Sequence, residues 1–273
     1  MLPMESRMSH LDINTNYNDH STSRNAGHRA ADVVGGLADF SWYALCKATG
    51  DIIAAIVLFI LTAPLMVLSM ILVKLTSRGP VIYSQTRLGR GGRPFTIYKI
   101  RTMLHDSEAK TGPRWSTADD PRITPVGRFL RRTHLDELPQ LYNILRGEMS
   151  LMGPRPERPE FVAQLERAIP RYRERLVVRP GVTGLAQVHL PPDTDLNSVR
   201  RKLVCDLFYI AQLGFWLDLR ILVCTALGLL GIPYATSRKI LRVPSPLASV
   251  EIVTQIMPSL IEPVEVGTQM HPA

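Results

Sequence analysis

Cysteine is scarce in this chain of 273 residues, and its three copies lie far apart, at Cys46, Cys205 and Cys224. They form no C-x-x-C pair, and the seven histidines show no metal-ligand spacing, so we expect no structural zinc site. The odd count, with Cys224 inside an apolar run, favours reduced and buried thiols. The first long apolar run begins only at Ile52, which is too late for a secretory signal peptide.

Two other kinds of residue are missing locally. Between residues 74 and 101 there are seven basic residues and no acid, in a chain of net charge +8, so this stretch should attract phosphate groups. Between residues 121 and 180 there are twelve arginines and no lysine. The planar fork of arginine suits phosphate oxygens, although ion pairs with the seven acids of the same stretch explain the bias equally well.

Several recognition signatures are also absent. The chain has no internal repeat and no recognised nucleic-acid-binding motif, so we expect no nucleic-acid partner. The glycine cluster at 89–92, G-R-G-G, matches neither a dinucleotide-binding fingerprint nor a P-loop. Hydrophobic residues at 45% exclude a wholly disordered chain, and charged residues at 21% exclude a multi-spanning membrane protein of the usual kind.

One long apolar run is present, the 22 uncharged residues 52–73. As a straight helix it measures roughly 33 Å, about the thickness of a bilayer's hydrocarbon core, so we interpret it as a membrane segment. Pro64 near its middle removes a backbone donor, and Thr62 is placed to bond a freed carbonyl. The residues allow a bent spanning helix or a re-entrant one. In both, the basic residues from Lys74 onward place that end in the cytoplasm.

Changes in composition set the expected domain boundaries. We expect a flexible tail over residues 1–46, a membrane helix over 47–76, a main domain over 77–236 and a loosely ordered tail over 237–273.

Short β-like runs within the main domain, at 81–84 and 95–100, flank the glycine cluster and predict a hairpin. Residues 197–217 are helical in pattern. The broken apolar run 221–235 is typical of core or of a membrane interface.

Two adjacent acids lie in the segment 133–147, THLDELPQLYNILRG. Its leucines and tyrosine form one apolar stripe at helical spacing, Pro139 suits a first helical turn, and Gly147 suits the position after the last. We therefore expect Asp136 at a helix N-cap, with Glu137 beside it at the positive end of the helix dipole. The plainer alternative is that the two acids serve only as a cap and a first-turn residue.

Two stiff turns that carry arginine follow the acids. The sequence G-P-R-P at 153–156 fixes Arg155 on a rigid backbone that suits a phosphate, and R-P-G-V-T-G at 179–184 is a second basic turn. A structural turn explains each alone. It does not explain why both carry arginine near an acidic pair and a membrane segment.

In this order, the motifs resemble the bacterial sugar transferase family, the monotopic polyprenyl-phosphate hexose-1-phosphate transferases. These include the undecaprenyl-phosphate galactose and glucose phosphotransferases of exopolysaccharide synthesis. The matching segments are YKIRTM at 98–103, LDELPQL at 135–141, MSLMGPRP at 149–156 and RPGVTGLAQV at 179–188, with WLDLRIL at 216–222 as a looser match. The resemblance covers about residues 47–228.

This resemblance implies an α/β, mostly helical fold with a small β element. One Pro-kinked re-entrant helix would anchor it in the bacterial inner membrane, with the catalytic domain on the cytoplasmic face. The implied activity moves a hexose 1-phosphate from a UDP-sugar to undecaprenyl phosphate and releases UMP, with Mg²⁺ as cofactor and membrane lipids as partners. A homo-oligomer is compatible with the sequence. The transferred sugar stays open between galactose, glucose and N-acetylated hexoses.

By the same resemblance, Asp136 is the nucleophile of a covalent aspartyl phosphosugar intermediate, and Asp136 and Glu137 hold the Mg²⁺. The expected substrate-binding residues are Lys99, Arg101, Arg155, Arg179 and Gln187. The family carries a Ser-Pro pair at the kink where this chain has Ala63-Pro64, and the Thr62 hydroxyl is placed to replace the serine.

Two other functions remain as alternatives. A membrane-anchored glycosyltransferase would move the sugar without its phosphate and release UDP rather than UMP. A non-catalytic membrane adaptor would bind anionic lipid or nucleic acid through its basic stretch, with salt-sensitive affinity and no nucleotide product.

Overall fold

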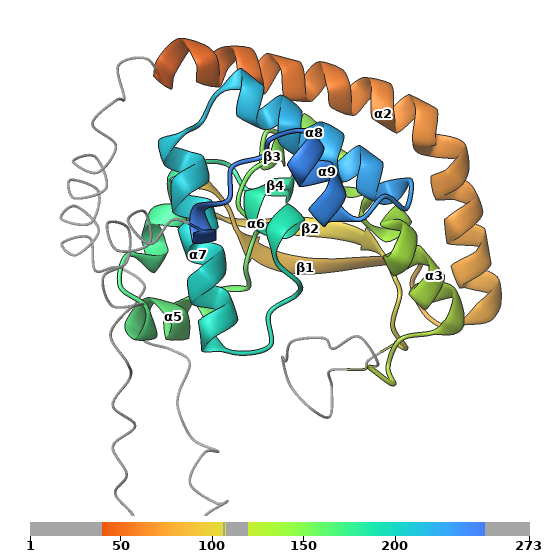
Figure 1. Cartoon of the computed structure of the whole chain (residues 1–273). Coiled ribbons are helices and arrows are strands. Elements are labelled where there is room, and N and C mark those ends of the chain that lie inside the picture. The colour runs from red at the N-terminus through yellow and green to blue at the C-terminus, as the bar shows by residue number, and fades with distance from the viewer. Residues whose placement is uncertain (1–39, 106, 108–119, 249–273) are drawn as a thin grey trace, which may run out of the picture. The chain divides into compact units, whose positions relative to one another are not determined.

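A long apolar helix, α2 (Phe40–Thr76), begins the part of the chain that the computed structural model describes, which is residues 40–105, 107 and 120–248 (Figure 1). Pro64 lies inside α2, and Figure 1 shows that the helix is bent. The carbonyl that Pro64 frees belongs to Ile60, one turn earlier. The Thr62 hydroxyl instead donates to the Leu58 carbonyl, at 2.7 Å, so the expectation that it takes up the freed carbonyl is wrong. The reason is local, because that hydroxyl reaches back four residues along its own helix face.

Most of α2 presents apolar side chains outward. The stretch Tyr43–Thr76 is the one described helix that is long and apolar enough to cross a membrane, and only 17% of its most apolar part is buried. Ile60 and Leu61, for example, are 67% and 68% exposed. A continuous apolar surface of this extent indicates contact with a membrane.

Both ends of α2 nevertheless pack against the rest of the described chain. Near its start, Lys47 donates to the Asp218 carboxylate at 2.7 Å. Near its end, Val73 is buried in a small hydrophobic cluster with Ile100 and Leu130. The rest of the described chain therefore contacts α2 near both of its ends.

The first sheet is an antiparallel hairpin of β1 (Ile82–Leu88) and β2 (Pro94–Ile100), joined through the short 3-10 turn η1 (Arg90–Gly92). It confirms the hairpin expected around the glycine cluster, although β1 runs beyond residue 84. The register pairs Tyr83 with Lys99.

The helix α3 (Pro125–Thr133), the 3-10 turn η2 (Leu135–Glu137) and the helix α4 (Gln140–Leu145) come next. Asn143 fastens α4 to β2: its amide donates to the Thr96 carbonyl at 2.7 Å and accepts from the Tyr98 N–H at 3.3 Å. The strand that carries Lys99 is thereby fixed against the segment that carries the two acids.

The second sheet pairs β3 (Ser150–Met152) with β4 (Gly181–Thr183) in parallel and brings the two arginine-bearing turns together. Glycine is required there, since a Cβ on Gly153 would lie 2.5 Å from the Arg179 carbonyl oxygen, and one on Gly181 would lie 2.1 Å from the Gly153 nitrogen. The chain between the two strands forms α5 (Pro159–Ala168) and the 3-10 helix η3 (Tyr172–Val177).

Helices fill the C-terminal part, and together with the two small sheets they confirm a mostly helical α/β fold. The elements are α6 (Leu185–His189), α7 (Leu196–Ala211), α8 (Phe215–Leu229), α9 (Tyr234–Ile240) and the 3-10 turn η4 (Pro246–Ala248). The stretch predicted to be helical at 197–217 divides at Gly214 into α7 and α8. The helix α9 continues past residue 236, and Arg238 ties it to α6 by donating to the Val188 and His189 carbonyls at 3.1 Å. Of the expected tails at 1–46 and 237–273, residues 1–39 and 249–273 lie outside the described residues, whereas residues 40–46 belong to α2.

The three thiols are all free, and two of them match expectation. Cys205 and Cys224 are buried, whereas Cys46 is exposed on α2, so the prediction of a buried thiol is wrong at that position. Cys46 lies on the outward surface of the helix, which the apolar pattern of the sequence did not reveal.

Candidate active site

The two acids follow a sharp change of chain direction. The helix α3 ends at Thr133, and the left-handed backbone of the next residue, His134, with φ of 55°, leads into η2. Asp136 lies inside this 3-10 turn, and α4 begins only after Pro139, so the expectation that Asp136 caps a helix is wrong. The turn is tighter than an α-helix because the Glu137 N–H bonds three residues back, to the His134 carbonyl at 3.1 Å. The end of α4 is as predicted, with Gly147 in the left-handed region at φ of 72°.

Glu137 is held between two cations that come from separate parts of the sequence. Lys99, on β2, donates to Glu137 Oε1 at 2.7 Å. Arg155 reaches the same carboxylate with both terminal nitrogens, one on each oxygen. Burial alone would raise the pKa of Glu137, but the charges of Arg155 and Lys99 outweigh it and hold that pKa well below its usual range. Glu137 is therefore a fixed anion that orients two cations.

Asp136 has a different environment from its neighbour. It is 6% exposed, and its carboxylate accepts no hydrogen bond within the described part of the chain. Burial and the charge of Glu137 raise the pKa of Asp136, although Lys99, Arg131 and Arg155 oppose them. A desolvated carboxylate with a raised pKa is more basic than one in water, which suits a nucleophile.

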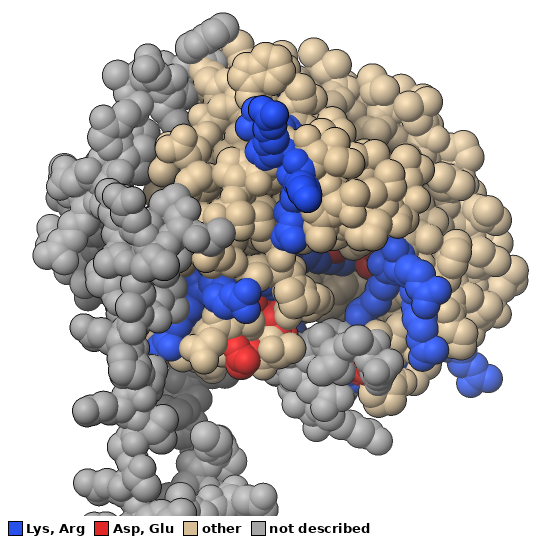
Figure 2. Space-filling model, viewed as in Figure 1, with Lys and Arg blue, Asp and Glu red and all other residues tan. Residues whose placement is uncertain are grey.

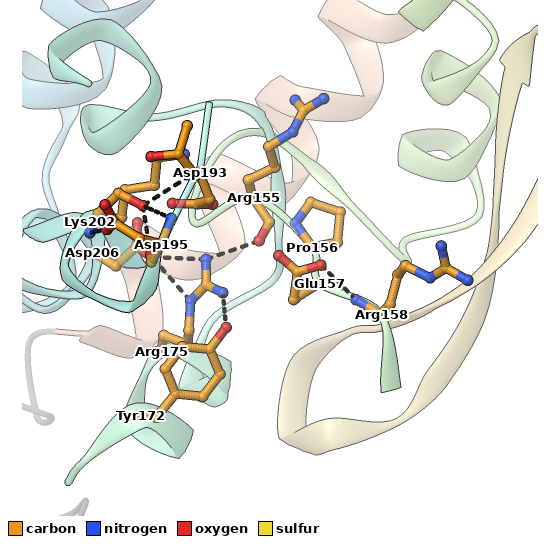
Figure 3. A network of polar contacts seen from close by, with 12 residues as sticks. Arg155, Pro156, Glu157, Arg158, Tyr172, Arg175, Asp193, Asp195, Lys202 and Asp206 are labelled. Atoms are coloured by element: carbon orange, nitrogen blue, oxygen red, sulfur yellow. Dashed lines mark hydrogen bonds and ion pairs between the residues drawn. The ribbon is translucent and has the colours of Figure 1, made fainter. Parts of the chain in front are cut away.

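A hydrogen bond to its backbone fixes the turn that carries Arg155. The Arg155 carbonyl accepts a hydrogen bond from Arg175, while the Arg155 guanidinium points away from Arg175 (Figure 3). That guanidinium donates to Glu137. The Arg155 side chain remains 44% exposed, so a phosphate group can reach it. On the face seen in Figure 2, Lys and Arg side chains border a hollow in which acidic atoms are visible.

The other expected site residues have no hydrogen bond or ion pair to this cluster within the described part of the chain. Arg101 donates to the carbonyl and hydroxyl of Ser77 at 2.9 and 2.8 Å, at the end of α2. Arg179 lies near the end of α4, with a terminal nitrogen 4.0 Å from where a Cβ on Gly147 would stand. The side-chain amide of Gln187 is buried with no hydrogen-bond partner among the described residues. Of the predicted residues, the structure brings together Asp136, Glu137, Lys99 and Arg155.

Three residues next to the site were not singled out from the sequence. Arg131, on α3, is close enough to Asp136 to lower its pKa. Asp206, the single acid in the helix α7 and flanked there by Cys205 and Leu207, forms a buried ion pair with Arg175. The isolation of Asp206 among apolar residues was a signal, because a buried acid needs a partner. Nothing in the local pattern marks Arg131 among the twelve arginines of its stretch.

Comparison with known proteins places the chain in a family. The family model described as bacterial sugar transferase matches residues 42–231. This range contains the acidic pair, both arginine-bearing turns and most of α2. The chain belongs to the bacterial sugar transferase family.

Individual relatives are similar over the same region. A protein of Aeromonas hydrophila named UDP-N-acetylgalactosamine-undecaprenyl-phosphate N-acetylgalactosaminephosphotransferase is 42% identical over 198 residues, which is 72% of this chain and 47% of that protein. A UDP-glucose:undecaprenyl-phosphate glucose-1-phosphate transferase of Caulobacter vibrioides is 44% identical over 188 residues, 68% of this chain and 70% of that protein. Exopolysaccharide production protein PSS of Rhizobium leguminosarum bv. phaseoli is 38% identical over 187 residues, 67% of this chain and 94% of that protein. The chain spans less than half the length of several curated relatives that it matches.

Proposed function

We propose that this protein transfers a hexose 1-phosphate from a UDP-sugar to undecaprenyl phosphate, with release of UMP, as an early membrane step of exopolysaccharide or other glycoconjugate synthesis. The observation that carries the proposal is the pair of unequal carboxylates. Asp136 is buried with a raised pKa, and Glu137 beside it is held by Lys99 and Arg155. The names of relatives from Aeromonas and Caulobacter support the same reaction class.

In the proposed reaction, a carboxylate oxygen of Asp136 attacks the phosphorus atom nearest the sugar. The bond from that phosphorus to the bridging oxygen breaks, and UMP leaves with the bonding electron pair. The phosphate oxygen of undecaprenyl phosphate then attacks the aspartyl phosphosugar and frees the carboxylate. Two displacements allow a soluble donor and a lipid acceptor to react in turn, which predicts ping-pong kinetics.

The diphosphate of the donor carries the same charge sign as the nucleophile, so cations must bring the two together. Arg155 offers a planar fork for two phosphate oxygens, and Lys99 adds a second positive charge at the same carboxylate. Glu137 holds both cations in place before the substrate arrives. Gln187 is a further candidate for donor binding because its buried amide has no partner within the described residues.

A magnesium ion is compatible with these residues. Mg²⁺ is usually bound by one or two carboxylates together with substrate phosphates and water. Asp136 fits this pattern best, since both oxygens of Glu137 already accept hydrogen bonds. Within the described residues no group of three His, Cys, Asp or Glu side chains gathers, so the phosphates would complete the shell. When bound, Mg²⁺ would supply charge neutralisation of the diphosphate.

We infer a re-entrant arrangement of α2 in the cytoplasmic membrane. Lys47 and Asp51 near its start contact Asp218 and the Leu151 N–H, and Val73 near its end packs on β2 and α3. A straight spanning helix would carry one of these ends to the opposite side of the bilayer, away from the domain that it contacts. The bend seen in Figure 1 supports the same arrangement.

The test is an assay of purified protein in detergent with undecaprenyl phosphate, Mg²⁺ and UDP-sugars, beginning with UDP-glucose and UDP-N-acetylgalactosamine. The proposal expects UMP in proportion to the lipid-linked sugar phosphate. Release of UDP would support the glycosyltransferase, and salt-sensitive lipid binding without nucleotide turnover would support the adaptor. An Asp136→Asn variant, which lacks the proposed nucleophile, is the negative control.

A further inference from the structure

The turn that carries Arg155 is unusually well fixed for a surface loop. Prolines on either side of Arg155 restrict the backbone. Every carbonyl from residue 154 to 157 accepts a hydrogen bond. The donors, in order, are the Gly181 N–H at 2.9 Å, the Arg175 guanidinium at 2.9 Å, the Arg87 guanidinium at 3.3 Å and the Leu88 N–H at 3.0 Å.

The bond to the Arg155 carbonyl differs from the others because its donor belongs to a buried network (Figure 3). Arg175 is 8% exposed, and its remaining nitrogens are also engaged. Its Nε donates to the Asp206 carboxylate at 2.9 Å, and the other terminal nitrogen donates to the Tyr172 hydroxyl at 2.8 Å. The terminal nitrogen that bonds the Arg155 carbonyl also lies 2.8 Å from the Asp206 carboxylate. Asp206 itself is 2% exposed.

These contacts fix the guanidinium plane of Arg175. The Asp206 carboxylate fixes one edge of the guanidinium, and the Tyr172 hydroxyl fixes the terminal nitrogen on the other side. The N–H that faces the turn can therefore point in only one direction. The backbone of Arg155 is thereby held at the position from which its side chain reaches both oxygens of Glu137. The path runs from α7 through η3 and the turn to the acidic pair.

We propose that Arg175 and Asp206 are positioning residues for the sugar-phosphate transfer and act through the backbone of Arg155. The inference rests on the proposed function, in which Arg155 binds a substrate phosphate. A displacement of about 1 Å in such a group can cost up to 100-fold in rate. If the pair merely stabilised the fold, its loss would lower the unfolding temperature without a specific effect on Arg155.

A double-mutant cycle separates the two roles. Asp206→Asn should lower kcat for UMP release about tenfold, with a smaller change in KM for the donor. In an Arg155→Ala background the same substitution should cost less than about twofold, because the group it positions is gone. Equal losses in both backgrounds would overturn the proposal. Arg175→Lys keeps the charge but not the fork, and should behave like Asp206→Asn.

The neighbouring Arg171–Glu174 pair provides the matched control. Glu174 lies on the same 3-10 helix and pairs with Arg171 at 2.8 Å, and none of the described contacts of Glu174 is with the turn. Glu174→Gln should therefore leave kcat within about twofold of the parent, in line with sites that do not interact. If Asp206→Asn does not fold, Tyr172→Phe removes only one bond to Arg175 and should show a smaller loss with the same dependence on Arg155.

Hydrogen–deuterium exchange tests the inference without any activity. In Asp206→Asn, the amides of Arg155 and Glu157 should exchange faster than in the parent, and in Glu174→Gln they should not. Unchanged exchange in a folded Asp206→Asn protein would contradict positioning, whatever the nucleotide assay shows. Absence of UMP release by the parent protein would instead count against the proposed function, and the exchange result would still decide the positioning role.

Discussion

Lys47, near the start of α2, donates a hydrogen bond of 2.7 Å to Asp218 in α8, 171 residues later. Asp218 also accepts from the hydroxyls of Tyr43 and Tyr209, each at 2.8 Å. The apolar helix is thus joined to the main domain through one buried carboxylate, which is 3% exposed.

The first prediction concerns this junction. Asp218→Asn removes the nearer of two carboxylates from the Lys47 ammonium and leaves only Asp51, at 3.9 Å. Breaking a buried pair costs about 3 kcal/mol or more of unfolding free energy when no other counter-charge remains, so we expect a loss of up to about 3 kcal/mol here. We expect a clearly lower midpoint of thermal unfolding in detergent. Arg146→Gln, which breaks the exposed pair with Glu148, is the control and should leave the midpoint unchanged. Equal midpoints for both variants would show that the Lys47–Asp218 contact carries no stability.

The second prediction concerns topology and uses a native thiol. Cys46 is exposed near the start of α2, whereas Cys205 and Cys224 are buried. If α2 is re-entrant, a membrane-impermeant maleimide should label Cys46 only after cells are permeabilised. Pro64→Ala should straighten the helix and make part of the protein reactive from outside. Cys46→Ser sets the background, and labelling of the unsubstituted protein in intact cells would establish a spanning helix.

The third prediction concerns phosphate recognition. Arg155→Lys retains a positive charge but loses the two-pronged contact with Glu137, so it should lower kcat/KM for the donor at least tenfold. Arg173→Lys, an exposed position with an ion pair to Glu166, is the matched control. Near-normal turnover by Arg155→Lys would show that only the positive charge of Arg155 matters for the reaction.

The fourth prediction concerns pH. Burial and the charge of Glu137 raise the pKa of Asp136 to about 6, and the attacking group must be ionised. The rate should therefore fall as pH drops through this region. Arg131 lowers the pKa of Asp136, so Arg131→Gln should move the acid limb of kcat/KM to higher pH. Arg132→Gln, at an exposed neighbouring position, should not move it. An acid limb that moved to lower pH in Arg131→Gln would contradict this assignment.

The acids and the stiff turn could be read from local sequence. Asp136 and Glu137 stand before a helical stripe that ends at Gly147, and prolines flank Arg155. What local pattern could not predict is which cations meet Glu137. Lys99 reaches it across 38 residues, on a strand whose placement depends on the contacts of Asn143.

Arg101 shows the limit of strand periodicity. Two residues apart on a strand, Lys99 and Arg101 would share a face and point into one site. The strand β2 ends at Ile100, so Arg101 leaves the alternation and turns to Ser77 at the end of α2. The N-cap expected at Asp136 failed for a similar reason, because His134 turns the chain into a 3-10 turn that no residue pattern announced.

The last prediction concerns the nucleophile. Asp136 does not lie at a helix N-terminus, where the helix dipole was expected to favour its ionised form, because α4 begins only after Pro139. Its reactivity is instead attributed to burial next to a carboxylate whose charge Lys99 and Arg155 balance. Incubation with a UDP-sugar labelled in the sugar, without lipid acceptor, should leave label on the peptide that contains Asp136. Asp136→Asn should abolish both this label and turnover, whereas Glu137→Gln should impair turnover by releasing Lys99 and Arg155 while leaving the attacking oxygen in place. Undecaprenyl phosphate added afterwards should remove the label, and initial rates should follow ping-pong kinetics. Label on another peptide, or kinetics that require donor and acceptor to be bound together, would make Asp136 a general base or a metal ligand instead of the nucleophile.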